Sequence, residues 1–227
     1  MLPGLICDAS MYAPQSAAFS DSLAVDGYGL CESLPGMAEI VLEQAPERFD
    51  LFGHSMGGRV AMEVYRKAPE RVRRLALVST GVHPVGANEP ASRAELQAIG
   101  HEQGYEALVD VWLPPMVAEA NRDKPEVYGA CREMCLRQSQ EQFDAQINAL
   151  LARPEVESLL PGIDCPTLVM TGGEDTWAGP EQHQRIADAI PDSELVIVEG
   201  AGHMIQLEAP AAVNAAIADW LSRPTED

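Results

Sequence analysis

The sequence is poor in basic residues and has no long hydrophobic run. Of its 227 residues only 15 are Lys or Arg, against 35 Asp or Glu, which gives a formal net charge of −20 at pH 7. Because so acidic a surface repels phosphate groups, the charge argues against nucleic acid and anionic membranes as partners. No stretch approaches the ~18 consecutive apolar residues of a membrane-spanning helix. The length and the 46% hydrophobic content fit one globular domain.

Cysteine is also scarce, and it is not arranged like a metal site. The five cysteines form no C-x-x-C pair and no Cys/His cluster with zinc spacing. Cys131 and Cys135 lie four positions apart, on one face of a helix, where we expect small buried thiols; a metal or redox pair is the alternative. The first residues lack a basic region followed by an apolar stretch, so no signal peptide is expected. The sequence therefore predicts a cytoplasmic protein without metal or cofactor.

Short and almost continuous apolar runs alternate with helical segments along most of the chain. Strands that are apolar throughout are typical of a sheet buried on both faces, which favours parallel pairing. Two of the helical segments open with Pro, which is favoured in the first helical turn. The alternation predicts an α/β fold with a doubly wound, mostly parallel sheet. The expected strands are 48–53, 74–79, 167–171 and 194–199, and the expected helices are 56–67, 180–190 and 210–221.

The stretch 84–161 has no strand-like run. Nearly 80 residues are far more than a loop needs, and their polar and apolar residues are mixed as in helices. We expect a helical cap inserted between two strands, with 1–83 and 162–227 forming the α/β core. The expected cap helices are 92–102, 105–113, 125–139 and 142–152.

The sharpest motif is G-x-S-x-G, at Gly53-His54-Ser55-Met56-Gly57, between an expected strand and an expected helix. A nucleophilic serine on such a turn has a strained backbone, and small residues two positions before and after it relieve the crowding. The N-terminus of the following helix offers free N–H groups to a developing oxyanion. The motif predicts that Ser55 is a nucleophile; the alternative is a tight turn with an idle serine.

A serine hydroxyl needs a base, and His203 is the best candidate among five histidines. It follows the expected strand 194–199 in a Gly-rich loop, at the end of a parallel strand where active-site residues collect. His54 lies within the turn itself and is expected to point elsewhere. His101 and His183 lie in helical segments that are expected to be exposed.

The third residue of such a site is a carboxylate that orients the imidazole. Asp175 follows the expected strand 167–171 and precedes His203 by 28 residues. Glu174 is the alternative acid, and Asp175 is preferred. The order Ser55, Asp175, His203 is the Ser…acid…His order of α/β-hydrolases.

With this motif and this order, the sequence resembles the α/β-hydrolase superfamily, and in detail its small bacterial esterase-like serine hydrolases. The resemblance covers almost the whole chain and is weakest in the cap. The matching segments are LPGLICD (2–8), APERFDLFGHSMGG (45–58), APERV (68–72), CPTL (165–168), GGED (172–175) and GAGH (200–203). The resemblance implies a catalytic triad of Ser55, Asp175 and His203.

The same resemblance implies an oxyanion hole made by the backbone N–H groups of Met56 and Leu5. The family usually has His-Gly before the second donor, whereas this chain has Pro3-Gly4. Since the donor is a backbone group, the change need not abolish it. In the family a central strand also precedes this loop, but here only two residues do. We expect either a strand that begins late in a sheet that compensates or, preferably, a natural protein with more residues upstream.

These observations predict a serine hydrolase that cleaves a carboxylic ester through an acyl-enzyme. The same triad serves acyltransferases, lactonases, thioesterases and C–C hydrolases, and a non-catalytic small-molecule-binding protein is the alternative of a different class. The apolar segment 112–117 is expected to pack the cap onto the core or to line an acyl pocket, with Trp112, Met116 and Trp177 as pocket residues. Because no Arg or Lys stands in a recognisable anion clamp and the chain is acidic, we expect a neutral, apolar ester. The sequence does not indicate an oligomeric state.

Overall fold

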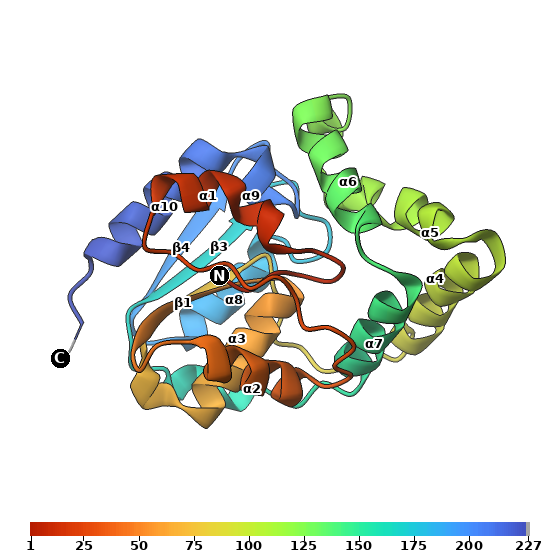
Figure 1. Ribbon diagram of the computed structural model, residues 1–227. Coiled ribbons are helices and arrows are strands. Elements are labelled where there is room, and N and C mark those ends of the chain that lie inside the picture. Colours follow the sequence, from red (N-terminus) through yellow and green to blue (C-terminus); the bar gives the residue numbers. More distant parts are fainter. Residues whose placement is uncertain (226–227) are drawn as a thin grey trace.

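The computed structural model describes residues 1–225, and its centre is a parallel sheet of four strands in the order β1-β2-β3-β4 (Figure 1). All three neighbouring pairs are parallel, so the predicted α/β fold with a parallel sheet is confirmed. The predicted strands agree with the observed ones to within two residues at each end. The strands are β1 (Phe49–His54), β2 (Val72–Val78), β3 (Thr167–Gly172) and β4 (Ser193–Val198).

Helices cover both faces of this sheet, as a doubly wound fold requires. Figure 1 shows α1, α9 and α10 on one face and α2, α3 and α8 on the other. The inner strand β3 is buried along its whole length, whereas its neighbour β4, at the edge of the sheet, is only partly buried. These helices are α1 (Ala13–Ala18), α2 (Leu34–Gln44), α3 (Met56–Lys67), α8 (Pro180–Ala189), α9 (Ile205–Glu208) and α10 (Pro210–Ser222).

Between β2 and β3 the chain leaves the sheet and forms a group of helices, which stands beside it at the right of Figure 1. Gly104, with φ of 99°, separates the first two helices, and a capping box at Ser139 begins the last. The predicted helix 125–139 is a π-helical turn followed by α6. These helices are α4 (Glu89–Gln103), α5 (Tyr105–Trp112), α6 (Ala130–Leu136) and α7 (Gln140–Leu151). The division into a core and a cap of 84–161 stays a prediction.

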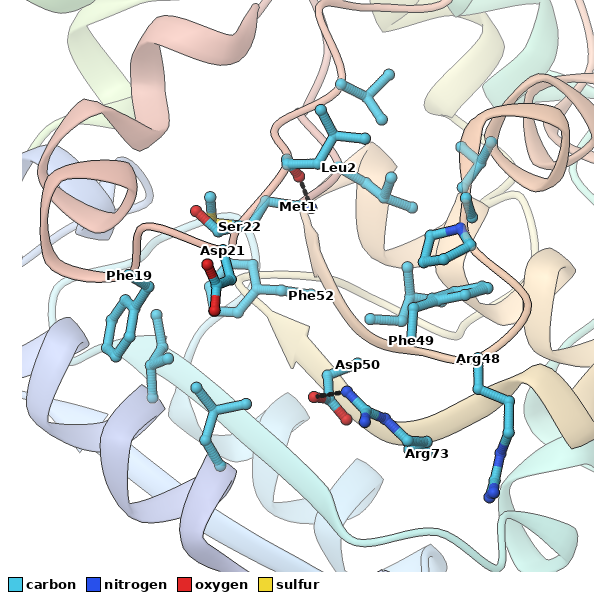
Figure 2. Close-up of a pocket in the computed structure, with 18 of the residues that line it drawn as sticks. Met1, Leu2, Phe19, Asp21, Ser22, Arg48, Phe49, Asp50, Phe52 and Arg73 are labelled. Atoms are coloured by element: carbon cyan, nitrogen blue, oxygen red, sulfur yellow. Dashed lines mark hydrogen bonds and ion pairs between the residues drawn. The ribbon is translucent and has the colours of Figure 1, made fainter. Parts of the chain in front are cut away.

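The first residues of the chain add a single bridge to the sheet. The Leu2 N–H donates to Phe52 O at 2.8 Å and the His54 N–H donates to Leu2 O at 3.1 Å, so that Leu2 pairs in parallel with Gly53. Beside the rest of the β1 edge lies a cavity of about 580 Å³, crossed by the ion pair of Asp50 with Arg73 (Figure 2). This cavity contains none of the predicted site residues.

The cysteines are free thiols, and Cys131 and Cys135 are both fully buried, in agreement with the expectation of small buried side chains. Within residues 1–225 no group of three or more His, Cys, Asp or Glu side chains is placed to hold a metal ion. Over the same range no helix combines the length and the apolar character needed to cross a bilayer.

Candidate active site

Ser55 is the single residue between β1 and α3, and its backbone conformation is one that residues other than glycine rarely adopt. Its φ is 55° and its ψ is −118°. The flanking glycines make this possible: a Cβ at Gly53 would lie 2.4 Å from Gly57 O, and a Cβ at Gly57 would lie 2.2 Å from Leu2 O. Either methyl group would force the strand, the turn and the first residues apart. The turn thus holds the serine hydroxyl out beyond the carboxyl end of β1.

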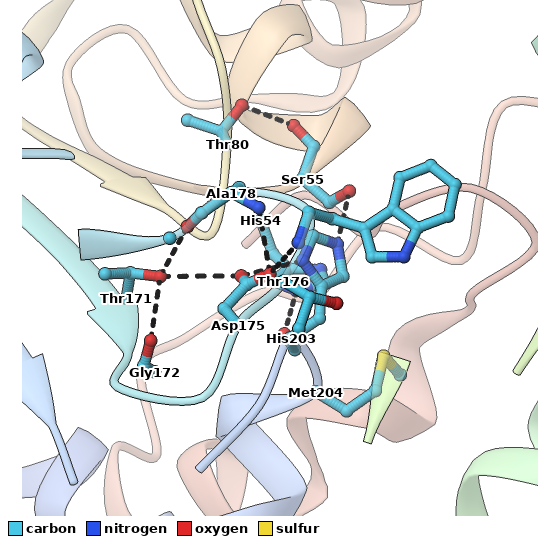
Figure 3. Close-up of polar contacts among 12 residues, drawn as sticks. His54, Ser55, Thr80, Thr171, Gly172, Asp175, Thr176, Ala178, His203 and Met204 are labelled. Carbon is cyan, nitrogen blue, oxygen red and sulfur yellow. Dashed lines mark hydrogen bonds and ion pairs between the residues drawn. The ribbon is translucent and has the colours of Figure 1, made fainter. Parts of the chain in front are cut away.

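Two hydrogen bonds connect the three residues predicted from the sequence, both of them made by His203 (Figure 3). His203, in the loop after β4, has its Nδ1 at 2.8 Å from Asp175 Oδ2 and its Nε2 at 2.8 Å from Ser55 Oγ. Because Nδ1 donates to the carboxylate, Nε2 is left to accept the serine proton. The backbone of this loop is also fixed. The His203 N–H donates to Met116 O at 2.9 Å, and the Met204 N–H donates to the same oxygen at 3.2 Å.

Asp175 is buried and receives more hydrogen bonds than the histidine alone provides. Its Oδ1 accepts from the backbone N–H groups of Trp177 and Ala178, both at 2.9 Å. Burial by itself raises the pKa of Asp175, but the charge of His203 and these hydrogen bonds outweigh it and hold the pKa well below its usual value. The carboxylate therefore remains ionised at neutral pH. The alternative acid, Glu174, is exposed to solvent.

Two residues with unpaired backbone N–H groups, within the described residues 1–225, border the cavity of Ser55. The N–H groups of Leu5 and Met56 donate to no acceptor within residues 1–225, and both residues line the cavity that contains Ser55. Gly4 brings the first loop against the turn, since a Cβ on it would lie 3.1 Å from Ser55 Cβ. The arrangement leaves two donors free for a developing oxyanion.

The loop that carries Leu5 is fixed by groups that the sequence did not single out. The Tyr28 hydroxyl donates to Pro3 O at 3.2 Å. Ile6, whose φ is 47°, donates its N–H to Gln146 Oε1 at 2.7 Å, and Gln146 belongs to α7. These contacts hold the Pro3-Gly4 loop in place.

Ser55 and His203 open into a cavity of about 350 Å³. The predicted pocket residues Trp112, Met116 and Trp177 all line it; the first two are buried and Trp177, 44% exposed, stands at its mouth. Segment 112–117 therefore both packs against the loop of His203 and borders the cavity.

A family model described as the alpha/beta hydrolase family matches residues 7–216. The chain belongs to this family. Its fold and its relatives identify it as a hydrolase, which acts on a small molecule.

Solved structures of similar proteins agree with this assignment. A thermophilic esterase from Thermogutta terrifontis, in a malate-bound structure, has a TM-score of 0.87 at 29% identity, covering 97% of this chain and 87% of the esterase. The enol-lactonase from Burkholderia xenovorans LB400 has a TM-score of 0.85 at 26% identity, covering 98% and 90%. Among curated proteins, the sn-1-specific diacylglycerol lipase ABHD11 of Mus musculus is 28% identical over 189 residues, which are 76% of this chain and 58% of the lipase.

The cavity of the hydrolase also contains charged residues that the sequence prediction missed. Arg59, Arg93 and Arg153 line it together with Glu89. The expectation that no Arg or Lys stands in a recognisable anion clamp considered the charge of the whole chain and not the charge of one cavity. A usable signal was present: Arg59 lies four residues after Ser55, on the same face of the helix that follows the turn.

His183 is buried, contrary to the expectation that it is exposed. α8 packs against β3 and β4, and this brings the imidazole against the end of β2, where Nε2 accepts the Thr80 N–H at 3.1 Å. Its Nδ1 donates to Gly179 O at 3.2 Å. Burial lowers the pKa of His183 to about 4. His54 points away from the serine, as expected: Nε2 donates to His203 O at 2.8 Å, and burial, together with the nearby His203, lowers the pKa of His54 to about 3.

Acid should weaken the fold partly through His183. Between pH 6.5 and about 4 the unfolded chain binds a proton at this imidazole that the folded chain does not, so the stability falls as the pH falls. We expect the difference in unfolding free energy between wild type and His183→Gln to shrink by about 1.4 kcal/mol for each pH unit over this window. Urea unfolding of both proteins at several pH values measures it, and parallel pH profiles would contradict the prediction.

Proposed function

We propose that this hydrolase cleaves a carboxylic ester through an acyl-enzyme on Ser55. The observation that carries the proposal is the 2.8 Å contact between Ser55 Oγ and His203 Nε2, made at the edge of a cavity with two free N–H donors beside it. A serine on a strained turn, a base within hydrogen-bond distance and a buried carboxylate behind the base are the parts that acyl transfer requires.

In the first half-reaction Ser55 Oγ attacks the ester carbonyl carbon while His203 Nε2 takes its proton. Asp175 keeps the proton of Nδ1 in place and stabilises the imidazolium that forms. The tetrahedral intermediate then collapses, the bond to the alcohol oxygen breaks, and His203 returns the proton to the leaving alcohol. In the second half-reaction water attacks the acyl-enzyme, His203 takes a proton from it, and the acid leaves as Ser55 recovers its hydrogen.

The N–H groups of Met56 and Leu5 are the donors to the oxyanion of both tetrahedral intermediates. The Met56 group stands at the N-terminus of α3, where the helix dipole adds to the stabilisation. Losing one donor of this kind lowers the rate by roughly 10²–10³ in enzymes of similar design. Because neither donor has an acceptor among residues 1–225, neither must break a hydrogen bond within this part of the chain to act.

A lactone is the second candidate substrate. It is an internal ester and needs the same attack, oxyanion hole and proton transfers. The similarity to the enol-lactonase, with 26% identity over 98% of this chain, supports it.

A fluorophosphonate probe tests the proposal directly. We expect one adduct per chain, located on the peptide that contains Ser55 by mass spectrometry, with loss of aryl-ester turnover in proportion to labelling. A panel of a linear ester, a lactone and a thioester then ranks the substrate classes. No adduct and no turnover across the panel would reject the proposal in favour of a non-catalytic binding protein.

A further inference from the structure

Arg59 is a buried cation that has no carboxylate partner among residues 1–225. It is 6% exposed and lies on α3, four residues after Ser55, which is about 6 Å along the helix axis. The acceptor that its guanidinium meets within residues 1–225 is His83 O, at 3.0 Å, and no carboxylate of this range lies within ion-pair distance. Arg59 lines the cavity of Ser55 and His203, so its guanidinium borders the place where a substrate would sit.

The neighbouring Arg153, in contrast, has both a carboxylate partner and backbone acceptors for its guanidinium. Its Nη1 and Nη2 donate to the two oxygens of Glu89 at 2.9 and 2.6 Å, and backbone carbonyls accept its other hydrogens. Glu89 is therefore occupied by Arg153 and is not the counter-ion of Arg59. Burial, and then the repulsion of Arg153, lower the pKa of Arg59 to about 9. A buried charge left in this condition is unfavourable until an anion pairs with it.

A second guanidinium stands nearer the mouth of the cavity. Arg93 contacts Glu89 at the longer distance of 3.4 Å, and its Cζ lies 5.5 Å from the ring centre of Trp177. The side chain is 13% exposed. Trp177 lines the same cavity, so this guanidinium lies over a ring that borders it.

The charge of the cavity is thus opposite to that of the whole chain. Three guanidinium groups and one carboxylate line it, whereas the chain carries a formal charge of −20. Charges on the outer surface are screened by salt over about 8–10 Å, while a guanidinium inside a narrow cavity acts at contact distance and with little water between. The local positive charge, and not the net charge of the chain, therefore determines whether a small charged ligand is attracted to Ser55.

Given the ester cleavage proposed above, on which this step rests, we propose that the substrate is a small ester bearing a free carboxylate, which Arg59 binds while Ser55 attacks the ester group. A monoester of a short dicarboxylic acid has this chemistry. Its two ends are a few bonds apart, which suits a serine and an arginine one helical turn apart, and its size suits a cavity of about 350 Å³. Arg93 provides a second donor at the mouth.

Two matched substrates test the proposal: 4-nitrophenyl hydrogen glutarate, which carries the carboxylate, and 4-nitrophenyl methyl glutarate, in which a methyl ester replaces it. We expect the wild type to prefer the acid, with a kcat/KM ratio of acid to neutral ester above one. Arg59→Met should lower that ratio by about tenfold to a hundredfold, through KM more than kcat, since a charge-assisted hydrogen bond is lost. Arg59→Lys should restore part of the ratio.

Arg66→Met is the matched control. It makes the same substitution on the same helix, but Arg66 is half-exposed, pairs with Glu63 and does not line the cavity. Its ratio should equal that of the wild type. A wild-type ratio of one or less, or an unchanged ratio in Arg59→Met, would overturn the proposal.

Binding separates a failure of this inference from a failure of the ester chemistry. Glutarate binding, measured by calorimetry on the wild type and Arg59→Met, needs no turnover. If no ester is cleaved but glutarate binds, and Arg59→Met weakens glutarate binding at least tenfold, the carboxylate site is supported and the proposed ester cleavage is rejected. If esters are cleaved but glutarate binding does not depend on Arg59, the proposed carboxylate site is rejected. Should Arg59→Met fail to fold, Arg59→Gln removes the same charge with a polar side chain, and an unchanged ratio and unchanged glutarate binding in that variant would overturn the proposal.

Discussion

Ser55→Ala should abolish ester turnover, with kcat falling by about 10⁴–10⁶, because the nucleophilic oxygen is removed and the rest of the site is left to act on water alone. The fold should persist. Alanine keeps the Cβ, so the strained φ of 55° and the packing of the two flanking glycines are unchanged. The measurement is kcat for an aryl ester beside a thermal melt of each protein.

Ser79→Ala is a matched control for this experiment. Ser79 also has a positive φ, of 44°, and follows β2 next to the turn, but it is fully buried and its hydroxyl has no hydrogen-bond partner among residues 1–225. Its turnover should stay within the same order of magnitude as that of the wild type. Substantial activity in Ser55→Ala, or equal losses in both variants, would show that Ser55 is not the nucleophile.

Asp175→Asn should lower kcat by about 10³–10⁴ with little effect on folding. An amide has the shape of the carboxylate, but it cannot stabilise the imidazolium, and its NH₂ group favours the tautomer in which Nε2 of His203 carries the proton. The imidazole then has no lone pair for the hydroxyl of Ser55. Rates of hydrolysis at saturating ester measure the effect.

Glu174→Gln, one residue earlier, makes the same chemical change on an exposed side chain. It should retain wild-type kcat. If Glu174→Gln were the damaging change and Asp175→Asn the silent one, the assignment of the acid would be reversed.

The fold and the clustering of the three candidate residues could be predicted because both depend on short-range patterns. Apolar runs such as Leu75–Val78 are buried on both faces wherever a parallel sheet forms, and the residues just after such runs meet at one edge of it. Ser55, Asp175 and His203 each follow a run of this kind. α2 was missed although its beginning carries a local signal: Ser33 caps it, accepting the Gly36 N–H at 3.2 Å.

The charges of the cavity could not be predicted in the same way. Helical periodicity treats a polar residue as one that faces water, but α3 is buried on nearly every side, so Arg59 is buried with it. The exposure of His183 depends on how α8 lies against the end of β2, which no local pattern describes. The net charge of −20 is a sum over the surface and does not report a few buried cations.

The contact between Met116 O and the loop of His203 restricts how substrate can reach the serine. Two N–H groups of that loop donate to this single carbonyl, and Glu208 ties the same region by accepting from Ala118 N at 2.9 Å and Met204 N at 3.0 Å. Swinging residues 116–118 outward would break these bonds and shift the base away from the hydroxyl. Substrate that reaches the serine along a path away from residues 116–118 leaves these bonds, and with them the 2.8 Å contact between His203 and Ser55, unchanged.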